Sequence, residues 1–231
     1  MIKMLKKQKG FTLIEMIVSL GVFSIVVTTA VGALLVVMST NQQLQSEQNV
    51  MTNLAFALDS MTRELRTGYS FFCGGVNSAN SPVIGGSTKI FDPGSNDHDS
   101  LDKTVTRDCP SGTGGVDVSP THDYQGVSFI EGGNSITGAS ASRILYFMDK
   151  NTSGDIKIMR RVGNNAPQSI LSSGIEIVNA EFFVSGSEFL SAGSDIEQPT
   201  VTIYIEARAA DDSNSNSYAI QTTVTQRTFD L

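Results

Sequence analysis

The longest apolar stretch of the chain runs from Phe11 to Met38, and Glu15 is its one charged residue. A helix needs about 20 such residues to cross the hydrocarbon core of a bilayer. The pattern therefore predicts a membrane helix. Four lysines precede the stretch, Lys3, Lys6, Lys7 and Lys9. Since positive charge is retained in the cytoplasm, we expect a cytoplasmic N-terminus, with everything after Met38 on the far side.

Polar residues enter the pattern after Met38, but apolar positions continue at helical spacing. They recur three, four and seven residues apart, at Leu44, Met51, Leu54, Ala55, Leu58, Met61 and Leu65. No proline occurs before Pro82, and Arg66 followed by Gly68 is typical of a helix end. The pattern predicts one continuous helix of about 55 residues that ends near Thr67, with an apolar stripe on its second half.

The rest of the chain separates into a polar tract and a strand-rich region. Residues 68–126 are rich in Gly, Ser, Asn and Asp, which predicts a long loop region with one or two short strands. Beyond it, runs of β-branched and aromatic residues predict strands at 125–130, 143–148, 156–162, 175–184, 200–207 and 219–227. Hairpin-like spacings favour one antiparallel sheet packed on the helical stripe, an α+β fold.

Charge argues against nucleic acid as a partner. The net charge is −7, and four of the 16 basic residues lie before Gly10. The remainder is more acidic still, and an acidic body repels phosphate backbones. We therefore expect no direct nucleic-acid binding.

The segment Lys9-Gly10-Phe11-Thr12-Leu13-Ile14-Glu15 resembles the N-terminal signal of type IV pilins and of the pseudopilins of type II secretion. The resemblance implies cleavage between Gly10 and Phe11 by a prepilin peptidase, N-methylation of Phe11, and a role for Glu15 in filament assembly. It also implies a pilin-like fold with five parts. These are a leader (1–10), a transmembrane and assembly helix (11–38), its amphipathic continuation (39–67), a variable loop region (68–126) and an antiparallel sheet domain (127–231).

The same resemblance implies where the protein acts and with what. The implied partners are other pilin or pseudopilin subunits, the peptidase, an inner-membrane assembly platform and membrane lipid. The implied location is the inner membrane, and afterwards a filament in the periplasm or on the cell surface. The length and the large polar tract favour a minor or initiating subunit over a major pilin. Gly32 stands where many major pilins carry a helix-breaking proline, so we expect a weaker tendency to unwind there.

Glu15 has a physical explanation in this setting. A lone carboxylate within a bilayer is costly, and so is the ammonium that cleavage would create on Phe11. In a filament these two groups can pair, within one subunit or between neighbours. Such a buried ion pair favours the correct register between subunits more than it adds to stability. We therefore interpret Glu15 as an assembly residue.

Other interpretations of the N-terminus remain open. An ordinary signal peptide cut after Ala33 would release a secreted adhesin or binding module, although the apolar stretch is longer than a typical signal core. An uncleaved anchor could carry a hydrolase, although the sequence contains no recognised nucleophile, phosphate-binding or zinc-protease motif. We predict no catalytic residues and no required cofactor.

Two weaker site predictions concern the polar region and a turn. Outside the cytoplasm, Cys73 and Cys109 could form a disulfide, with two unpaired thiols as the alternative. The turn between two predicted strands places oxygen side chains at Asp149, Asn151, Ser153 and Asp155, as a calcium loop does. Arg160 replaces the acid that would complete such a loop, so a polar hairpin turn is the simpler interpretation, although calcium occurs in some pseudopilins.

Overall fold

The computed structural model describes residues 10–74, 106–112, 125–132, 143–150, 155–163, 165–188, 197–210 and 216–227. The chain divides into two compact units, Met1–Ser46 and Glu47–Leu231. Helix α1 (Leu13–Thr67, 55 residues) begins in the first unit and ends in the second. It confirms the predicted long helix, including its end: the Gly68 N–H donates to the Glu64 carbonyl at 3.0 Å. Gly32 interrupts nothing, because α1 is continuous.

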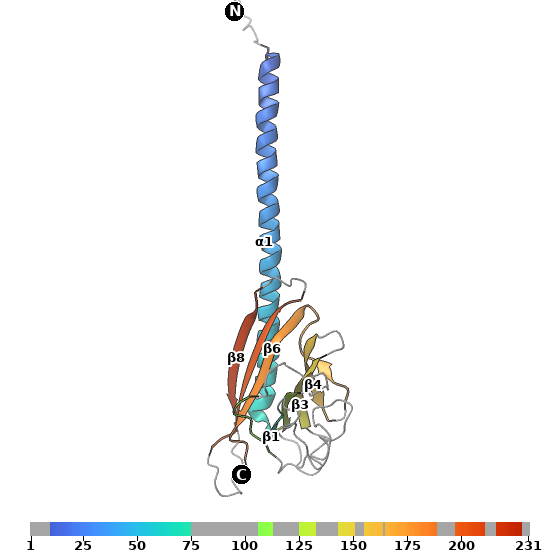
Figure 1. Cartoon of the computed structure of the whole chain (residues 1–231), viewed down its shortest axis with the longest axis vertical. Coiled ribbons are helices and arrows are strands. Elements are labelled where there is room, and N and C mark those ends of the chain that lie inside the picture. Colours follow the sequence, from blue (N-terminus) through green and yellow to red (C-terminus); the bar gives the residue numbers. More distant parts are fainter. Residues whose placement is uncertain are drawn as a thin grey trace, which may run out of the picture. The chain divides into compact units, whose positions relative to one another are not determined.

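The strands of the second unit form two antiparallel sheets among the described residues (Figure 1). The five-stranded sheet has the order β1 (Tyr69–Gly74), β2 (Gln125–Ile130), β3 (Arg143–Lys150), β4 (Ile156–Val162) and β5 (Gln168–Ser169). The three-stranded sheet has the order β6 (Ile175–Ser185), β7 (Thr200–Ala209) and β8 (Tyr218–Thr225). The α+β, pilin-like arrangement is confirmed, while the single predicted sheet is divided into two.

The buried face of α1 confirms the predicted stripe at Leu54, Leu58, Met61 and Leu65 and differs from it elsewhere. The helix buries Val50, Leu54, Ala57, Leu58, Met61 and Leu65, and all of these except Ala57 belong to a core shared with both sheets. Met51, by contrast, is 52% exposed, Ala55 is exposed, and Leu44, in the first unit, is 49% exposed. The prediction was wrong at these three positions because they lie about 70° to 110° around the helix from the centre of the buried positions 50, 54, 57, 58, 61 and 65.

A short segment, Arg107–Cys109, connects the two sheets. Arg107 bonds to β1, donating its N–H to the Phe71 carbonyl at 3.1 Å and accepting from the Cys73 N–H at 3.0 Å. Cys109 bonds to β6, donating its N–H to the Val184 carbonyl at 2.9 Å. Cys73 and Cys109 form a disulfide with their Cα atoms 5.8 Å apart. We call Arg107–Cys109 the staple, because it is bonded to an edge of each sheet.

A polar network fixes α1 to the five-stranded sheet. The Glu64 carboxylate accepts two hydrogen bonds from Arg160 on β4, from Nε at 3.0 Å and from Nη2 at 2.8 Å. It also accepts one from the Tyr146 hydroxyl on β3 at 2.6 Å. Burial, and then the hydrogen bond to Glu64, raise the pKa of Tyr146 far above its ordinary value. The phenol therefore remains a donor throughout the neutral range.

A second polar contact holds the bulge of β1. Ser70 is buried and has a φ of 55°. This left-handed conformation is energetically unfavourable for residues other than glycine. The buried Arg143 side chain donates to the Ser70 carbonyl at 2.7 Å and to the Ser128 hydroxyl at 2.8 Å. Burial lowers the pKa of Arg143 to about 10, so the guanidinium is still charged at neutral pH. These bonds compensate for the unusual backbone of the bulge.

Candidate functional site

The predicted cleavage site lies in an open, exposed segment immediately before α1. Gly10 is exposed, and a Cβ added to it would meet no atom within 4 Å. Phe11 is 78% exposed. The backbone around the Gly10–Phe11 bond is thus outside the helix, where a peptidase can bind it in an extended form.

Thr12 and Glu15 close the first turn of α1 reciprocally. The Glu15 N–H donates to the Thr12 hydroxyl at 3.4 Å, and the Thr12 N–H donates to the Glu15 carboxylate at 3.5 Å. This is the geometry of a capping box, with Thr12 as N-cap and Glu15 at the third helical position, although both bonds are long. The pattern Thr12-x-x-Glu15 is the sequence signal for this cap, and the interpretation of Glu15 as an assembly residue leaves it out. Glu15 therefore has a local role besides its predicted role in assembly.

The apolar part of α1 is exposed on all sides in the first unit. Every residue from Leu13 to Met38 is exposed, and α1 is the one helix among the described residues that is long and apolar enough to cross a membrane. Its four hydroxyl residues in this range each donate to a carbonyl three or four residues earlier, and these are Ser19, Ser24, Thr28 and Thr29. The hydroxyls are therefore satisfied without water, as a hydrocarbon environment requires.

Residues 5–31 match the family model of the prokaryotic N-terminal methylation motif. This stretch carries a prepilin-type signal. The signal supports a pilin-like or pseudopilin-like substrate of prepilin peptidase, in agreement with the resemblance drawn from Lys9–Glu15, and it points to a family of structural subunits. None of the curated proteins and none of the solved structures matches the chain.

The structure describes two of the four residues of the predicted calcium site, Asp149 and Asp155. Asp149 lies at the end of β3, opposite Lys157 of β4, and Asp155 immediately precedes β4. Asn151 and Ser153 lie outside the described residues. Within the described part of the chain, no group of three or more His, Cys, Asp or Glu residues could hold a metal ion. The predicted hairpin between β3 and β4 is confirmed.

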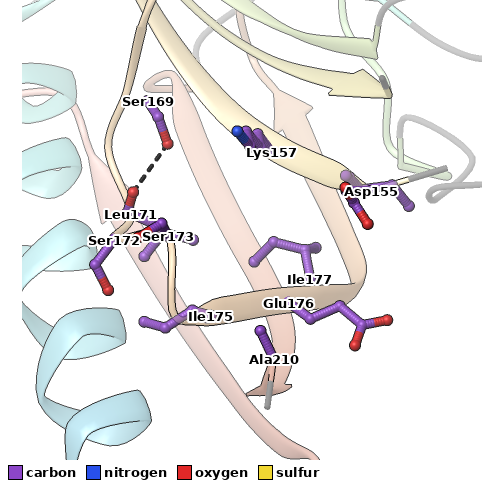
Figure 2. A pocket seen from close by; sticks show the side chains of 11 residues that line it. Asp155, Lys157, Ser169, Leu171, Ser172, Ser173, Ile175, Glu176, Ile177 and Ala210 are labelled. Atoms are coloured by element: carbon purple, nitrogen blue, oxygen red, sulfur yellow. Dashed lines mark hydrogen bonds between the residues drawn. The ribbon is translucent and has the colours of Figure 1, made fainter. Parts of the chain in front are cut away.

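An open pocket of about 450 Å³ lies beside this hairpin (Figure 2). It is framed by the start of β4, the segment 169–173 and the start of β6, with side chains of Ile175 and Ile177 among its walls. The Ser169 hydroxyl donates to the Leu171 carbonyl at 2.9 Å, which stabilises the turn. No histidine or cysteine is among the 11 lining residues. The pocket therefore presents no pair of nucleophile and base of the Ser–His or Cys–His kind.

Proposed function

We propose that this protein is a structural subunit of a type IV pilus or of a type II secretion pseudopilus. In this proposal a prepilin peptidase cuts after Gly10, Phe11 is N-methylated, and the apolar part of α1 moves from lipid into a filament. The observation that carries the proposal is the methylation motif at residues 5–31, placed at the start of a long exposed apolar helix. The mechanism is assembly, and the subunit performs no chemistry of its own.

The charge pattern supports the proposed orientation and location. Lysines before Gly10 keep the N-terminus in the cytoplasm, so the unit Glu47–Leu231 lies outside the inner membrane. An extracytoplasmic position is also the environment in which a disulfide such as Cys73–Cys109 persists. Partners in this proposal are other subunits with the same signal, the peptidase, the assembly platform and membrane lipid.

A minor or initiating position suits the chain better than that of a major pilin. The tract 68–126 adds a large polar segment between the helix and the later strands. A subunit repeated many times in a tight lattice would have to accommodate this segment at every position. A subunit present in few copies avoids that requirement.

The test is the intact mass and the N-terminal residue of the protein isolated from its native membrane. We expect a chain that begins with N-methylated Phe11. A chain that begins at Leu34 would show cleavage after Ala33 by an ordinary signal peptidase, and an intact Met1 would show an uncleaved anchor. Either result would overturn the proposal.

A matched pair of glycine variants tests recognition at the cleavage site. Gly10→Val should remain uncut, whereas Gly21→Val should be cut like the parent. Both glycines have open space around the added Cβ, so neither change produces a clash. Normal cleavage of Gly10→Val would place the recognition elsewhere.

A further inference from the structure

Three of the four edge strands in the described sheets are protected against further pairing. β1 has a shifted register between Tyr69 and Phe72 and is bridged by Arg107 of the staple. β5 contains two residues. β6 has a shifted register between Ile177 and Asn179, is bridged by Cys109, and carries two glutamates. Bulges, shortness, charge and covering segments are the devices by which proteins prevent unwanted strand pairing.

The fourth edge strand, β8, has none of these devices among the described residues. Its eight residues, Tyr-Ala-Ile-Gln-Thr-Thr-Val-Thr, include no charge and no proline. It pairs with β7 over its full length without a register shift, and within the described residues β7 is its one strand partner (Figure 1). An edge that is long, regular and uncharged is a template for another strand.

One hydrogen bond fixes which backbone groups face outward. The Gln226 N–H donates to the Pro199 carbonyl at 3.0 Å, in line with the β7–β8 register. Because the direction alternates along an antiparallel strand, residues 218, 220, 222 and 224 bond toward β7. The N–H and C=O groups of Ala219, Gln221, Thr223 and Thr225 therefore point to the open edge.

We propose that the β8 edge binds an extended strand of a different filament subunit, which adds a fourth strand to the β6–β7–β8 sheet. This proposal rests on the proposed function, because it takes the partner from the same filament. Strand addition obtains its affinity from main-chain hydrogen bonds, for which β8 offers four donors and four acceptors.

The described edges favour a different chain over a second copy. Since β1, β5 and β6 are protected, the described strands of a second copy offer only β8 as a free edge. Such a pair would be two-fold symmetric and closed, whereas growth of a filament requires an open contact. A different subunit with a free strand avoids this restriction.

The surroundings of β8 indicate the side chains of the partner strand. The Tyr218 hydroxyl hydrogen-bonds Glu47 of α1, which places the start of β8 beside that side of the helix. Met51 and Ala55 follow Glu47 at intervals of four, so they share its row, and both are exposed. An added strand with apolar residues on its inward side would cover this row.

The experiment is photocross-linking of the full chain in its native cells, with benzoylphenylalanine at position 221. The control probe replaces Glu181, which lies in the same cross-strand row as Tyr204 and Gln221 but on the protected β6. Each probe is then combined with Thr223→Pro or Thr223→Ala. Both substitutions lose the hydroxyl contact to Thr202 at 2.9 Å, but Pro alone also loses the outward N–H. Thr225→Pro, at the end of the strand, is a second variant should Thr223→Pro fold poorly.

We expect position 221 to form an adduct with another subunit that carries a prepilin-type signal. Thr223→Pro should reduce this adduct by about tenfold or more, the factor that corresponds to 1.4 kcal/mol. Thr223→Ala should preserve it, and position 181 should form none. Three results would overturn the proposal. Position 221 could form no adduct, its adduct could persist in Thr223→Pro and Thr225→Pro, or the adduct could join two copies of this chain. The N-terminal mass of the same samples tests the proposed function separately, since processing at Gly10 does not involve β8.

Discussion

Glu15 illustrates how one side chain can serve one role before cleavage and another role after it. In the structure its carboxylate accepts from the Thr12 N–H and completes the cap of α1. After cleavage, Phe11 would carry a free ammonium four residues away, and the same carboxylate could pair with it. Capping needs an acceptor, whereas pairing needs a charge, so the two roles can be separated by substitution.

Glu15→Gln keeps the capping acceptor and removes the charge, while Glu15→Leu removes both. If charge pairing governs assembly, both variants should enter filaments about tenfold less than the parent, or worse. Both should still insert in the membrane. The measurement is the filament fraction relative to the membrane fraction. Normal incorporation of Glu15→Gln would leave capping as the sufficient explanation.

Tyr146 gives a residue-level prediction on stability. Tyr146→Phe removes a hydrogen bond to a charged carboxylate, which should lower the free energy of unfolding by about 1.5 to 3 kcal/mol near neutral pH. The measurement is denaturant unfolding of the full chain in detergent. Arg160 still neutralises Glu64 in the variant, so the fold should persist.

The difference in unfolding free energy between the parent and Tyr146→Phe should depend on pH, with a definite sign. Because the pKa of Tyr146 is raised in the folded protein, the unfolded chain loses that proton first, above about pH 10. The parent should therefore lose up to about 1.4 kcal/mol of stability per pH unit above pH 10, relative to Tyr146→Phe. A constant difference between pH 8 and pH 11 would contradict the raised pKa.

At the scale of elements, local patterns predicted most of the strands but not their grouping. β2 and β4 have the predicted bounds, and β3, β6, β7 and β8 differ by one to a few residues. β1 is harder to predict because Ser70 interrupts its alternation with a positive φ, and β5 is too short for any period. The division into two sheets depends on which distant strands pair, and that information is not local.

The staple gives a prediction at this scale. Replacing Cys73 and Cys109 by alanine should lower the free energy of unfolding by about 3 to 4 kcal/mol, the chain-entropy value for a loop of this length. The sequence separation is 36 residues. The reduced parent should match the double variant in denaturant unfolding. Equal stability of the oxidised parent and the variant would mean that the backbone bonds of the staple suffice.

At the scale of the whole chain, the two units differ in what they require from their surroundings. The unit Glu47–Leu231 has a hydrophobic core of its own, whereas every residue from 11 to 38 is exposed. The sequence predicted this division from the change in pattern at Met38. It predicted the buried side of the second half of α1 correctly at Leu54, Leu58, Met61 and Leu65, but it chose Met51 in place of Val50, because both fit a helical stripe by spacing.

A chain that begins at Gln42 should be soluble and monomeric without detergent. Its thermal midpoint should be within a few degrees of that of the full chain in detergent, since the removed residues contribute nothing to the core. Size-exclusion chromatography and thermal unfolding are the measurements. Persistent aggregation of this chain would contradict the division into units.

The hydroxyl groups in the apolar part of α1 affect how easily this part moves from lipid into contact with other proteins. Ser19, Ser24, Thr28 and Thr29 are each bonded within their own helix, so none depends on a lipid headgroup or on a neighbouring chain. Exchanging lipid tails for apolar side chains then replaces one set of dispersion contacts by another of similar strength. Such an exchange is close to thermoneutral and can run in either direction. If the proposed filament forms, α1 can therefore enter it and leave it without breaking the hydrogen bonds of these four side chains.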